Sequence, residues 1–95
     1  MSKRTIKIKV SEEHIKRGGR SASTCPIALA IKEKYPEFDE VVAGIHKIKL
    51  YPDHKPRIKW VARTPQECYL FIVEFDNGGY YGPFETEVEF ELSYD

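Results

Sequence analysis

Residues 85–92 read ETEVEFEL, and this stretch decides the fold. A glutamate alternates with an apolar or β-branched residue over its whole length. A two-residue period is typical of a strand that buries one face and exposes the other. The exposed face then carries four glutamates in a row, and these repel one another unless cations lie beside them.

The other end of the chain supplies those cations. Residues 6–10 read IKIKV, so Lys7 and Lys9 alternate with apolar residues. Opposite charges across neighbouring strands contribute ~0.2–1 kcal/mol per pair, and like charges cost a similar amount. We therefore predict that the strand at 6–10 lies next to the strand at 85–92, with lysines and glutamates on one solvent face. The alternative is two charged faces that are solvated separately.

Two helices are indicated in the first third of the chain. Ser11 followed by two acids is a favourable start for a short helical turn, which Gly18 then ends. Cys25-Pro26 begins the second helix, because proline is favoured at the first helical position. This helix is expected to continue to about Lys34, and Pro36 ends it.

Residues 65–76 are ambiguous between strand and helix. Their aromatic and β-branched side chains have strand propensity. However, Thr64 and Glu67 have the spacing of a capping box, with Pro65 at the first helical position. The apolar residues from Cys68 onward also recur with helical spacing. A helix is the favoured interpretation, and a strand is the alternative.

Two further strands are expected at 40–51 and 57–63, joined by a turn at 52–56 into an antiparallel hairpin. The sequence thus predicts one α+β domain over residues 1–95. It should contain a small mixed sheet of about four strands, with two main helices packed on one face. The predicted core comprises Ile6, Ile8, Ile27, Leu29, Ile31, Ile48, Trp60, Phe71, Ile72, Val88 and Phe90.

Composition sets limits on function. The chain of 95 residues has no net charge, yet residues 64–95 carry eight acids and no Lys or Arg. It contains no apolar run of the length of a signal peptide or membrane span, so we expect a cytoplasmic protein that does not bind a membrane. Cys25 and Cys68 fit no disulfide framework and are expected to be free thiols. The histidine and cysteine spacing matches no zinc pattern, so neither a metal nor a cofactor is predicted.

The loop before the second helix has the composition of an anion site. Glycines let the backbone approach a ligand, hydroxyls and helix-start amides donate hydrogen bonds, and an arginine supplies charge. The predicted ligand-binding residues are Gly18, Gly19, Arg20, Ser21, Ser23, Thr24 and Cys25. Tyr80 or Tyr81 would cover a base if the two loops converge. A merely flexible connection accounts for the same loop residues.

Four segments resemble a family of small uncharacterised proteins of bacteriophages and mobile elements. They are VSEEHI (residues 10–15), CPIALA (25–30), FIVEFDNG (71–78) and PFE (83–85). The resemblance implies a cysteine-proline helix, a closing strand that begins at Pro-Phe, and a host-interaction or anti-defence role in the host cytoplasm. Family members carry a second cysteine before the Cys-Pro pair, where this chain has residues 22–24 (AST), which argues against a metal or redox role for Cys25.

Two classes of function therefore stay open. The first is a non-enzymatic phage-type binding module, which sequesters a phosphate-bearing, nucleotide-type ligand at the Gly18–Cys25 loop or blocks a host protein by direct contact. The second is a small enzyme in which Cys25 is the nucleophile and His14 the base. Nucleic-acid binding is less favoured, because the basic residues are expected to pair with glutamates. The oligomeric state is not predicted.

Overall fold

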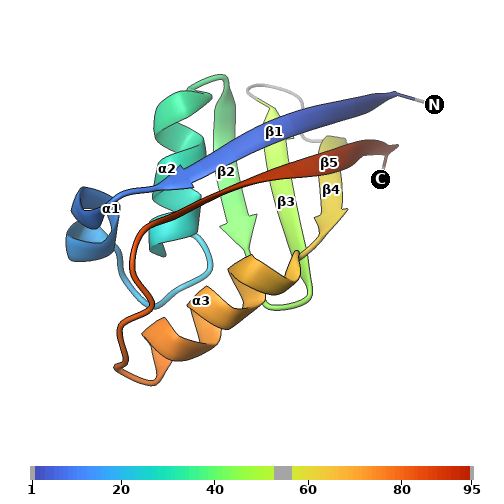
Figure 1. Ribbon diagram of the computed structural model, residues 1–95. Helices are drawn as coiled ribbons and strands as arrows, with labels where there is room; N and C mark the ends of the chain where they lie inside the picture. Colours follow the sequence, from blue (N-terminus) through green and yellow to red (C-terminus); the bar gives the residue numbers. More distant parts are fainter. Residues whose placement is uncertain (1, 53–56, 95) are drawn as a thin grey trace.

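The computed structural model describes residues 2–52 and 57–94. Within these residues the chain forms five strands and three helices (Figure 1). The elements are β1 (Lys3–Val10), α1 (Glu12–Arg17), α2 (Pro26–Lys34), β2 (Phe38–Ala43), β3 (Lys47–Pro52), β4 (Ile58–Arg63), α3 (Gln66–Asp76) and β5 (Phe84–Tyr94). The α+β class is as predicted. The strands lie in the order β1-β5-β4-β3-β2.

The sheet differs from the prediction in two respects. The single strand expected at 40–51 is two strands, β2 and β3, which turn at Gly44. The Gly44 N–H donates to the carbonyl of Lys47 at 3.0 Å, and the Thr64 hydroxyl donates to the Gly44 carbonyl at 2.6 Å. The sheet is also antiparallel throughout rather than mixed. The helix α3 crosses one end of the sheet, at which β4 finishes (Figure 1). The chain therefore returns to the sheet from that same end, and β5 runs antiparallel to β4.

The predicted pairing of the two charged strands is confirmed. In the antiparallel register of β1 and β5, Lys7 lies opposite Glu87. Lys3 Nζ is 3.5 Å from a carboxylate oxygen of Glu89, and Lys7 Nζ is 3.5 Å from one of Glu85. The alternate residues of both strands face the core, for example Ile6 on β1 and Phe90 on β5. The hairpin of β3 and β4 is confirmed as well, although residues 53–56 of its predicted turn lie outside the described residues.

The sheet curls until α2 contacts both of its edge strands, β1 and β2. One backbone N–H of each edge strand has a partner outside the sheet. The N–H of Lys7 donates to the Tyr35 hydroxyl at 3.2 Å, and the N–H of Ala43 donates to the carbonyl of Ala22 at 2.8 Å. The molecule is therefore an open barrel whose side gap is filled by a helix, which protects both edges from pairing with another chain.

The helices begin close to where the sequence places them. Cys25 is the N-cap of α2, and Pro26 is its first residue. The predicted helix at 65–76 forms as α3, but its capping box does not. Pro65 is the N-cap of α3, and the Thr64 hydroxyl is used on the β2–β3 turn instead.

The core lies inside the curl, between the concave side of the sheet and the two longer helices. It contains the predicted residues except Leu29 and Trp60, which are half-buried. Leu29 is on the side of α2 that faces away from buried Ile27 and Ile31. Trp60 has the predicted inward phase, but it lies close to an open end of the barrel.

Candidate functional site

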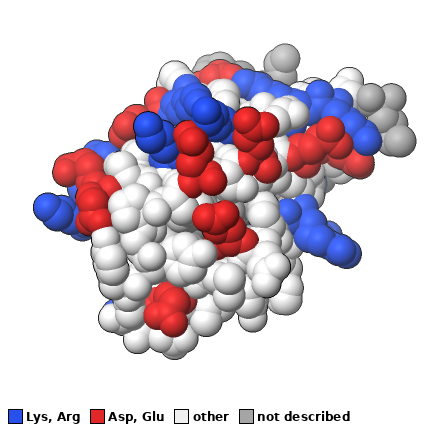
Figure 2. Space-filling view, in the orientation of Figure 1, with Lys and Arg blue, Asp and Glu red and all other residues white. Residues whose placement is uncertain are grey.

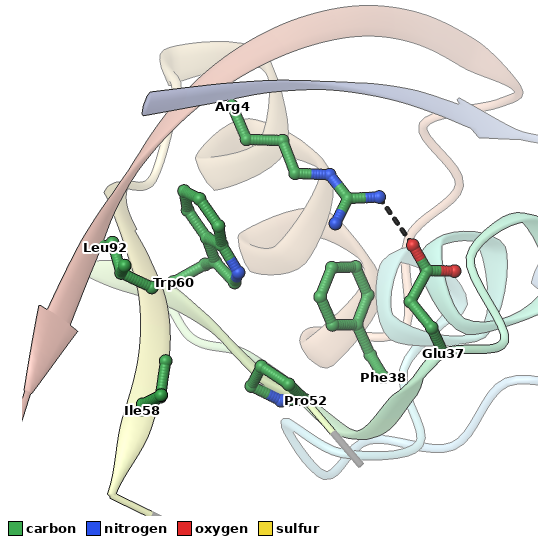
Figure 3. A pocket seen from close by; sticks show the side chains of 7 residues that line it. All are labelled: Arg4, Glu37, Phe38, Pro52, Ile58, Trp60 and Leu92. Carbon is green, nitrogen blue, oxygen red and sulfur yellow. Dashed lines mark hydrogen bonds and ion pairs between the residues drawn. The ribbon is translucent and has the colours of Figure 1, made fainter. Parts of the chain in front are cut away.

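The end of the barrel away from α3 holds a cavity of about 420 Å³, which we call the mouth cavity (Figure 3). Strands β1, β2 and β4 begin at this end of the barrel, and strands β3 and β5 finish there. Each of the five strands contributes at least one side chain to the cavity. Its lining residues are Arg4, Glu37, Phe38, Pro52, Ile58, Trp60 and Leu92. The wall is mostly apolar, with one cation and one acid, which is the usual composition of a small-molecule site.

Arg4 occupies a position on β1 that normally takes an apolar side chain. It has the same inward phase as Ile6 and Ile8, both fully buried. Its Nη2 lies 2.5 Å from a carboxylate oxygen of Glu37, and its guanidinium carbon lies 5.0 Å from the centre of the Phe38 ring. The hydrogen bond from Arg4 lowers the pKa of the Glu37 carboxyl below its usual value. The guanidinium is thus held over an aromatic ring at the rim of the cavity.

Trp60 forms one side of the mouth cavity. It pairs across the sheet with Leu50 on β3 and with Leu92 on β5. Figure 3 shows its indole ring reaching toward Arg4 across the space above Pro52. Among the described residues no other aromatic ring packs against this indole. The indole is half-buried against the core, and the part of it that lines the mouth cavity is a flat aromatic surface on which a ring could stack.

Sequence reasoning missed this site, although two signals for it are present. Arg4 stands two residues before Ile6, so a long cation interrupts the apolar phase of the first strand. Trp60 follows Ile58 in the same phase, near the start of its strand. The missing information was that both positions lie at the same end of a curled sheet, which depends on the pairing of β5 between β1 and β4.

The predicted Gly18–Cys25 loop is compact, and its polar groups largely bond one another. The Gly19 N–H donates to the Thr24 carbonyl at 2.8 Å, and the N–H groups of Thr24 and Cys25 both donate to the Ser21 carbonyl. The Ser21 hydroxyl lies 2.8 Å from that of Thr24 and 3.3 Å from that of Ser23. These donors already have partners within the loop.

The two glycines of the loop have a packing role. A Cβ on Gly18 would lie 2.5 Å from the ring of Pro26, and one on Gly19 would lie 2.7 Å from the Thr24 hydroxyl. Contacts this short leave no room for a side chain unless the neighbour moves. Gly18 is therefore needed for the loop to close against the rigid ring of Pro26, whereas a side chain at position 19 would require the Thr24 hydroxyl to move.

Three of the predicted residues line a smaller cleft of about 240 Å³ beside α3. They are Arg20, Ser21 and Cys25, and the cleft also contains Ile72 and Asp76. Burial raises the pKa of the Cys25 thiol, and the amides of Ile27 and Ala28 partly oppose this effect. The thiol therefore occupies the start of α2, where the predicted anion was expected. The Asp76 carboxylate further disfavours an anion in this cleft.

The Gly18–Cys25 loop and the loop that holds Tyr80 and Tyr81 were expected to converge, and they do so only in part. Arg20 reaches the end of α3, where its Nη2 is 3.9 Å from the position that a Cβ on Gly78 would take. The two tyrosines lie elsewhere. The Tyr80 hydroxyl donates to the Glu12 carboxylate, and the ring of Tyr81 packs edge-on against Phe71 and Phe84.

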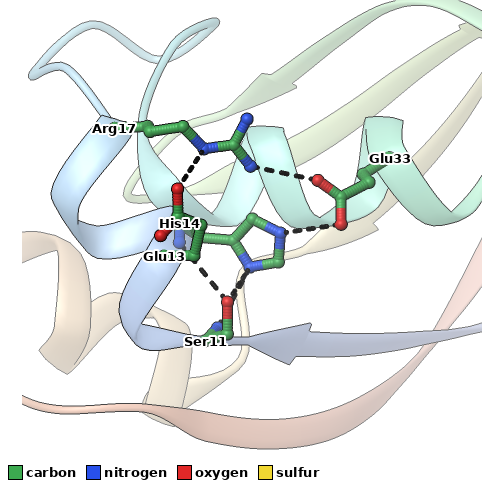
Figure 4. A network of polar contacts seen from close by, with 5 residues as sticks. All are labelled: Ser11, Glu13, His14, Arg17 and Glu33. Atoms are coloured by element: carbon green, nitrogen blue, oxygen red, sulfur yellow. Dashed lines mark hydrogen bonds and ion pairs between the residues drawn. The ribbon is translucent and has the colours of Figure 1, made fainter.

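His14 belongs to a polar network that joins α1 to α2 (Figure 4). Its Nδ1 accepts from the Ser11 N–H at 3.0 Å and lies 3.0 Å from the Ser11 hydroxyl. Its Nε2 is 3.4 Å from the carboxylate of Glu33, which also binds Arg17 at 3.1 Å. This resembles a serine–histidine–carboxylate triad, but the Nδ1 lone pair is occupied by a backbone N–H. The network therefore caps α1.

The same network bears on the proposed Cys25–His14 pair. His14 bonds Ser11 and Glu33, while the Cys25 sulfur lies 3.9 Å from the carbonyl of Ala22 and 4.0 Å from that of Ala43. Neither group faces the other. The geometry gives this pair no means of activating the thiol.

On the outward side of the sheet the acidic row of β5 lies between cationic strands, whereas β4 and its other neighbour β3 are both cationic, with Lys47 directly opposite Arg63. The glutamates of β5 lie between the lysines of β1 and the outward-facing Lys59 and Arg63 of β4. Figure 2 shows the resulting mixture of blue and red along the upper part of the molecule. A nucleic-acid backbone laid across this surface would meet rows of both signs, which disfavours the nucleic-acid alternative.

No protein-family model, curated protein or solved structure matches this chain. The described part of the chain contains no group of three or more His, Cys, Asp or Glu side chains placed to hold a metal ion. Its helices are too short or too polar to cross a membrane. Both cysteines are buried and free, as the sequence predicts.

Proposed function

We propose that this protein is a non-enzymatic binding module that holds a planar, anionic small molecule in the mouth cavity. One observation carries the proposal: the guanidinium of Arg4 on β1 and the indole of Trp60 on β4 line the same mostly apolar cavity. The volume of about 420 Å³ is within the ~300–1,000 Å³ typical of small-molecule sites.

The two groups fit two parts of a nucleotide-type ligand. The Trp60 indole offers a stacking face to a base, and base–aromatic stacking contributes ~1–3 kcal/mol. The guanidinium of Arg4 has five N–H donors, and within the described residues its side chain makes one hydrogen bond, to Glu37. The remaining donors suit a phosphate or carboxylate at the rim.

Glu37 orients this arginine. Its carboxylate holds one edge of the guanidinium and leaves the other edge toward the cavity (Figure 3). An arginine fixed in this way loses less side-chain freedom on binding, so the ion pair preorganises the site. The pair also selects against a ligand whose acid would have to lie directly beside Glu37.

The Gly18–Cys25 loop remains the second candidate for the anion. Arg20 and the hydroxyls of Ser21, Ser23 and Thr24 favour it, whereas the internal hydrogen bonds and Asp76 count against it. Under either location, the resemblance to phage and mobile-element proteins suggests the same role. The protein would sequester a nucleotide-type signal that belongs to a host defence system.

The decisive experiment uses the fluorescence of Trp60, which is the single tryptophan of the chain. The emission is followed while linear and cyclic nucleotides are added. A ligand in the mouth cavity should quench or shift this emission, and Arg4→Gln should weaken binding by about 10- to 150-fold, as expected for a charged hydrogen bond. Arg20→Gln is the matched control and should change the affinity by less than about 2-fold.

Each other outcome is informative. Loss of binding in Arg20→Gln but not in Arg4→Gln would move the ligand to the Gly18–Cys25 loop. An unchanged emission and no calorimetric heat across the panel would contradict ligand binding at both places, and direct contact with a host protein would replace it. Circular dichroism of both variants excludes unfolding as the cause.

A further inference from the structure

α3 has an uncharged solvent face. Its outward positions recur with helical spacing and belong to Gln66, Tyr69, Leu70, Val73 and Asn77, which we call the α3 face. Tyr69 and Leu70 are each 42% exposed, and Val73 is half-buried. A surface helix normally places charged residues on this side, whereas a helix that is apolar all round is normally covered all round. In the described structure α3 is covered on one side alone.

Two further exposed apolar side chains lie beyond the borders of the helix. Tyr81 is 38% exposed and packs against Phe71 at a ring distance of 6.0 Å. On the other side, Ile45 is 42% exposed beside Ile72. Figure 2 shows the matching area, the lower half of the molecule over α3, as largely white with isolated red patches. Exposed apolar side chains gathered on one side of a molecule and bordered by charged residues are typical of a protein-binding face.

The charges at the borders specify the partner. Helical spacing places Glu67 and Glu74 along one side of the α3 face, and α3 contains no Lys or Arg. Asp76 lies along the other side, where it shares a cleft with Arg20, so the uncompensated acidic border is the one formed by Glu67 and Glu74. A second copy of the chain would bring acids against acids. We infer that the α3 face docks a second protein whose contact surface is apolar and bordered by lysine or arginine.

This surface is separate from the mouth cavity. The β4 strand ends where α3 begins, whereas Trp60 and Ile58 lie toward the opposite end of the same strand. A partner on α3 therefore leaves the cavity open, and the inference does not rest on ligand binding.

The test uses two synthetic amphipathic helical peptides with the same leucine stripe, one bordered by lysines and the other by glutamates. Binding of each labelled peptide to the full chain is measured by fluorescence anisotropy. The lysine peptide should bind at least about 10-fold more tightly at low salt, and the difference should shrink at about 1 M salt. Trp60 emission should stay constant throughout.

Two variants locate the binding. The pair Tyr69→Ser and Leu70→Ser removes apolar surface, and the pair Glu67→Gln and Glu74→Gln removes the acidic border. The first pair should weaken the binding of both peptides by at least about 10-fold, and the second pair should abolish the preference for the lysine peptide. The matched control Asp39→Asn with Glu40→Gln, at exposed acids on β2, should change neither. The affected side chains are exposed or half-buried, and an unchanged melting temperature verifies the fold.

Equal binding of both peptides, binding of neither, or binding that the α3 variants leave intact would overturn the inference. Sedimentation of the chain alone gives one further reading. A dimer that Leu70→Ser dissociates would show that a second copy, rather than a basic partner, occupies the α3 face.

Discussion

Reversal of the lysines on β1 tests whether the charge pattern of the sheet contributes to its stability. Lys7 lies directly opposite Glu87 and 3.5 Å from a Glu85 oxygen, and Lys9 lies directly opposite Glu85. The double variant Lys7→Glu, Lys9→Glu converts these pairings into contacts between carboxylates. The row of four glutamates on β5 would then have acids on one flank instead of cations.

The magnitude follows from the exposure of the pairs. The side chains of Lys7 and Glu85 are 47% and 48% exposed, so each lost attraction is at the modest level of surface ion pairs, ~0.2–1 kcal/mol. Each new carboxylate–carboxylate contact adds a repulsion of about the same size. Two positions together should lower the free energy of unfolding by about 1–3 kcal/mol at low salt, and by about half as much or less at about 1 M salt.

The assay is urea unfolding at both salt concentrations. Lys16→Glu with Lys32→Glu is the matched control, because it changes the net charge equally at exposed helix positions. It should cost clearly less than the β1 reversal. Adding Glu85→Lys and Glu87→Lys to the β1 reversal swaps the two charges and should restore most of the lost stability. A loss that is equal at both salt concentrations, or no rescue by the swap, would refute the electrostatic account of strand pairing.

Three further predictions concern the core, an acid and a thiol. Phe71→Ala should lower the free energy of unfolding by ~3–5 kcal/mol, because the side chain is buried among Phe75, Tyr81 and Phe84. Leu29→Ala should lower it by less than ~2 kcal/mol, and urea unfolding measures both variants. The hydrogen bond from Arg17, and next the charge of His14, lower the pKa of Glu33. This acid therefore stabilises the fold above its unfolded pKa near 4.5, and the contribution is lost as the pH falls through the folded pKa. Glu33→Gln should flatten the melting temperature between about pH 3 and 5 relative to the parent. Burial raises the pKa of the Cys68 thiol to about 12, so this thiol in the folded protein should react slowly with thiol reagents at pH 8, which labelling kinetics measure. The free energy of unfolding should fall above about pH 9, because the thiol of the unfolded chain then loses its proton, and melts at alkaline pH measure this loss.

The parts of the fold that the sequence predicts are those with a strong local pattern. The alternation in residues 85–92 and 6–10 predicts both the strands and their pairing, because charge repulsion leaves few other arrangements. Cys25-Pro26 likewise marks the start of α2. The missed features depend on long-range contacts. The turn at Gly44 is closed by a hydrogen bond from the hydroxyl of Thr64, twenty residues later. The residues next to Gly44 in the sequence do not predict this hydrogen bond.

The candidate site illustrates the same limit. The Gly18–Cys25 loop drew attention because its composition is suited to anions, yet its glycines fit against Pro26 and Thr24 and its hydroxyls bond one another. Composition alone does not distinguish donors that are free from donors already used. The mouth cavity, in contrast, has no local motif, because its seven residues come from separate segments and only the curled sheet brings Arg4 and Trp60 to the same end.

The position of Arg4 is the strongest reason to regard the mouth cavity as functional. Its side chain is 33% exposed and that of Glu37 is 51% exposed, so their ion pair contributes only ~0–1 kcal/mol. An apolar side chain at this inward position would instead fill part of the cavity against Phe38 and Trp60, and each buried methylene contributes ~0.8 kcal/mol. The guanidinium carbon also lies 5.4 Å from the centre of the Tyr35 ring and 5.0 Å from that of Phe38, and such cation–π contacts contribute ~0.5–1 kcal/mol each at exposed sites. The two choices are therefore comparable in stability, and stability alone does not select arginine at position 4. A guanidinium that a carboxylate fixes at the rim of a mostly apolar cavity supports the proposal that an anionic group binds there.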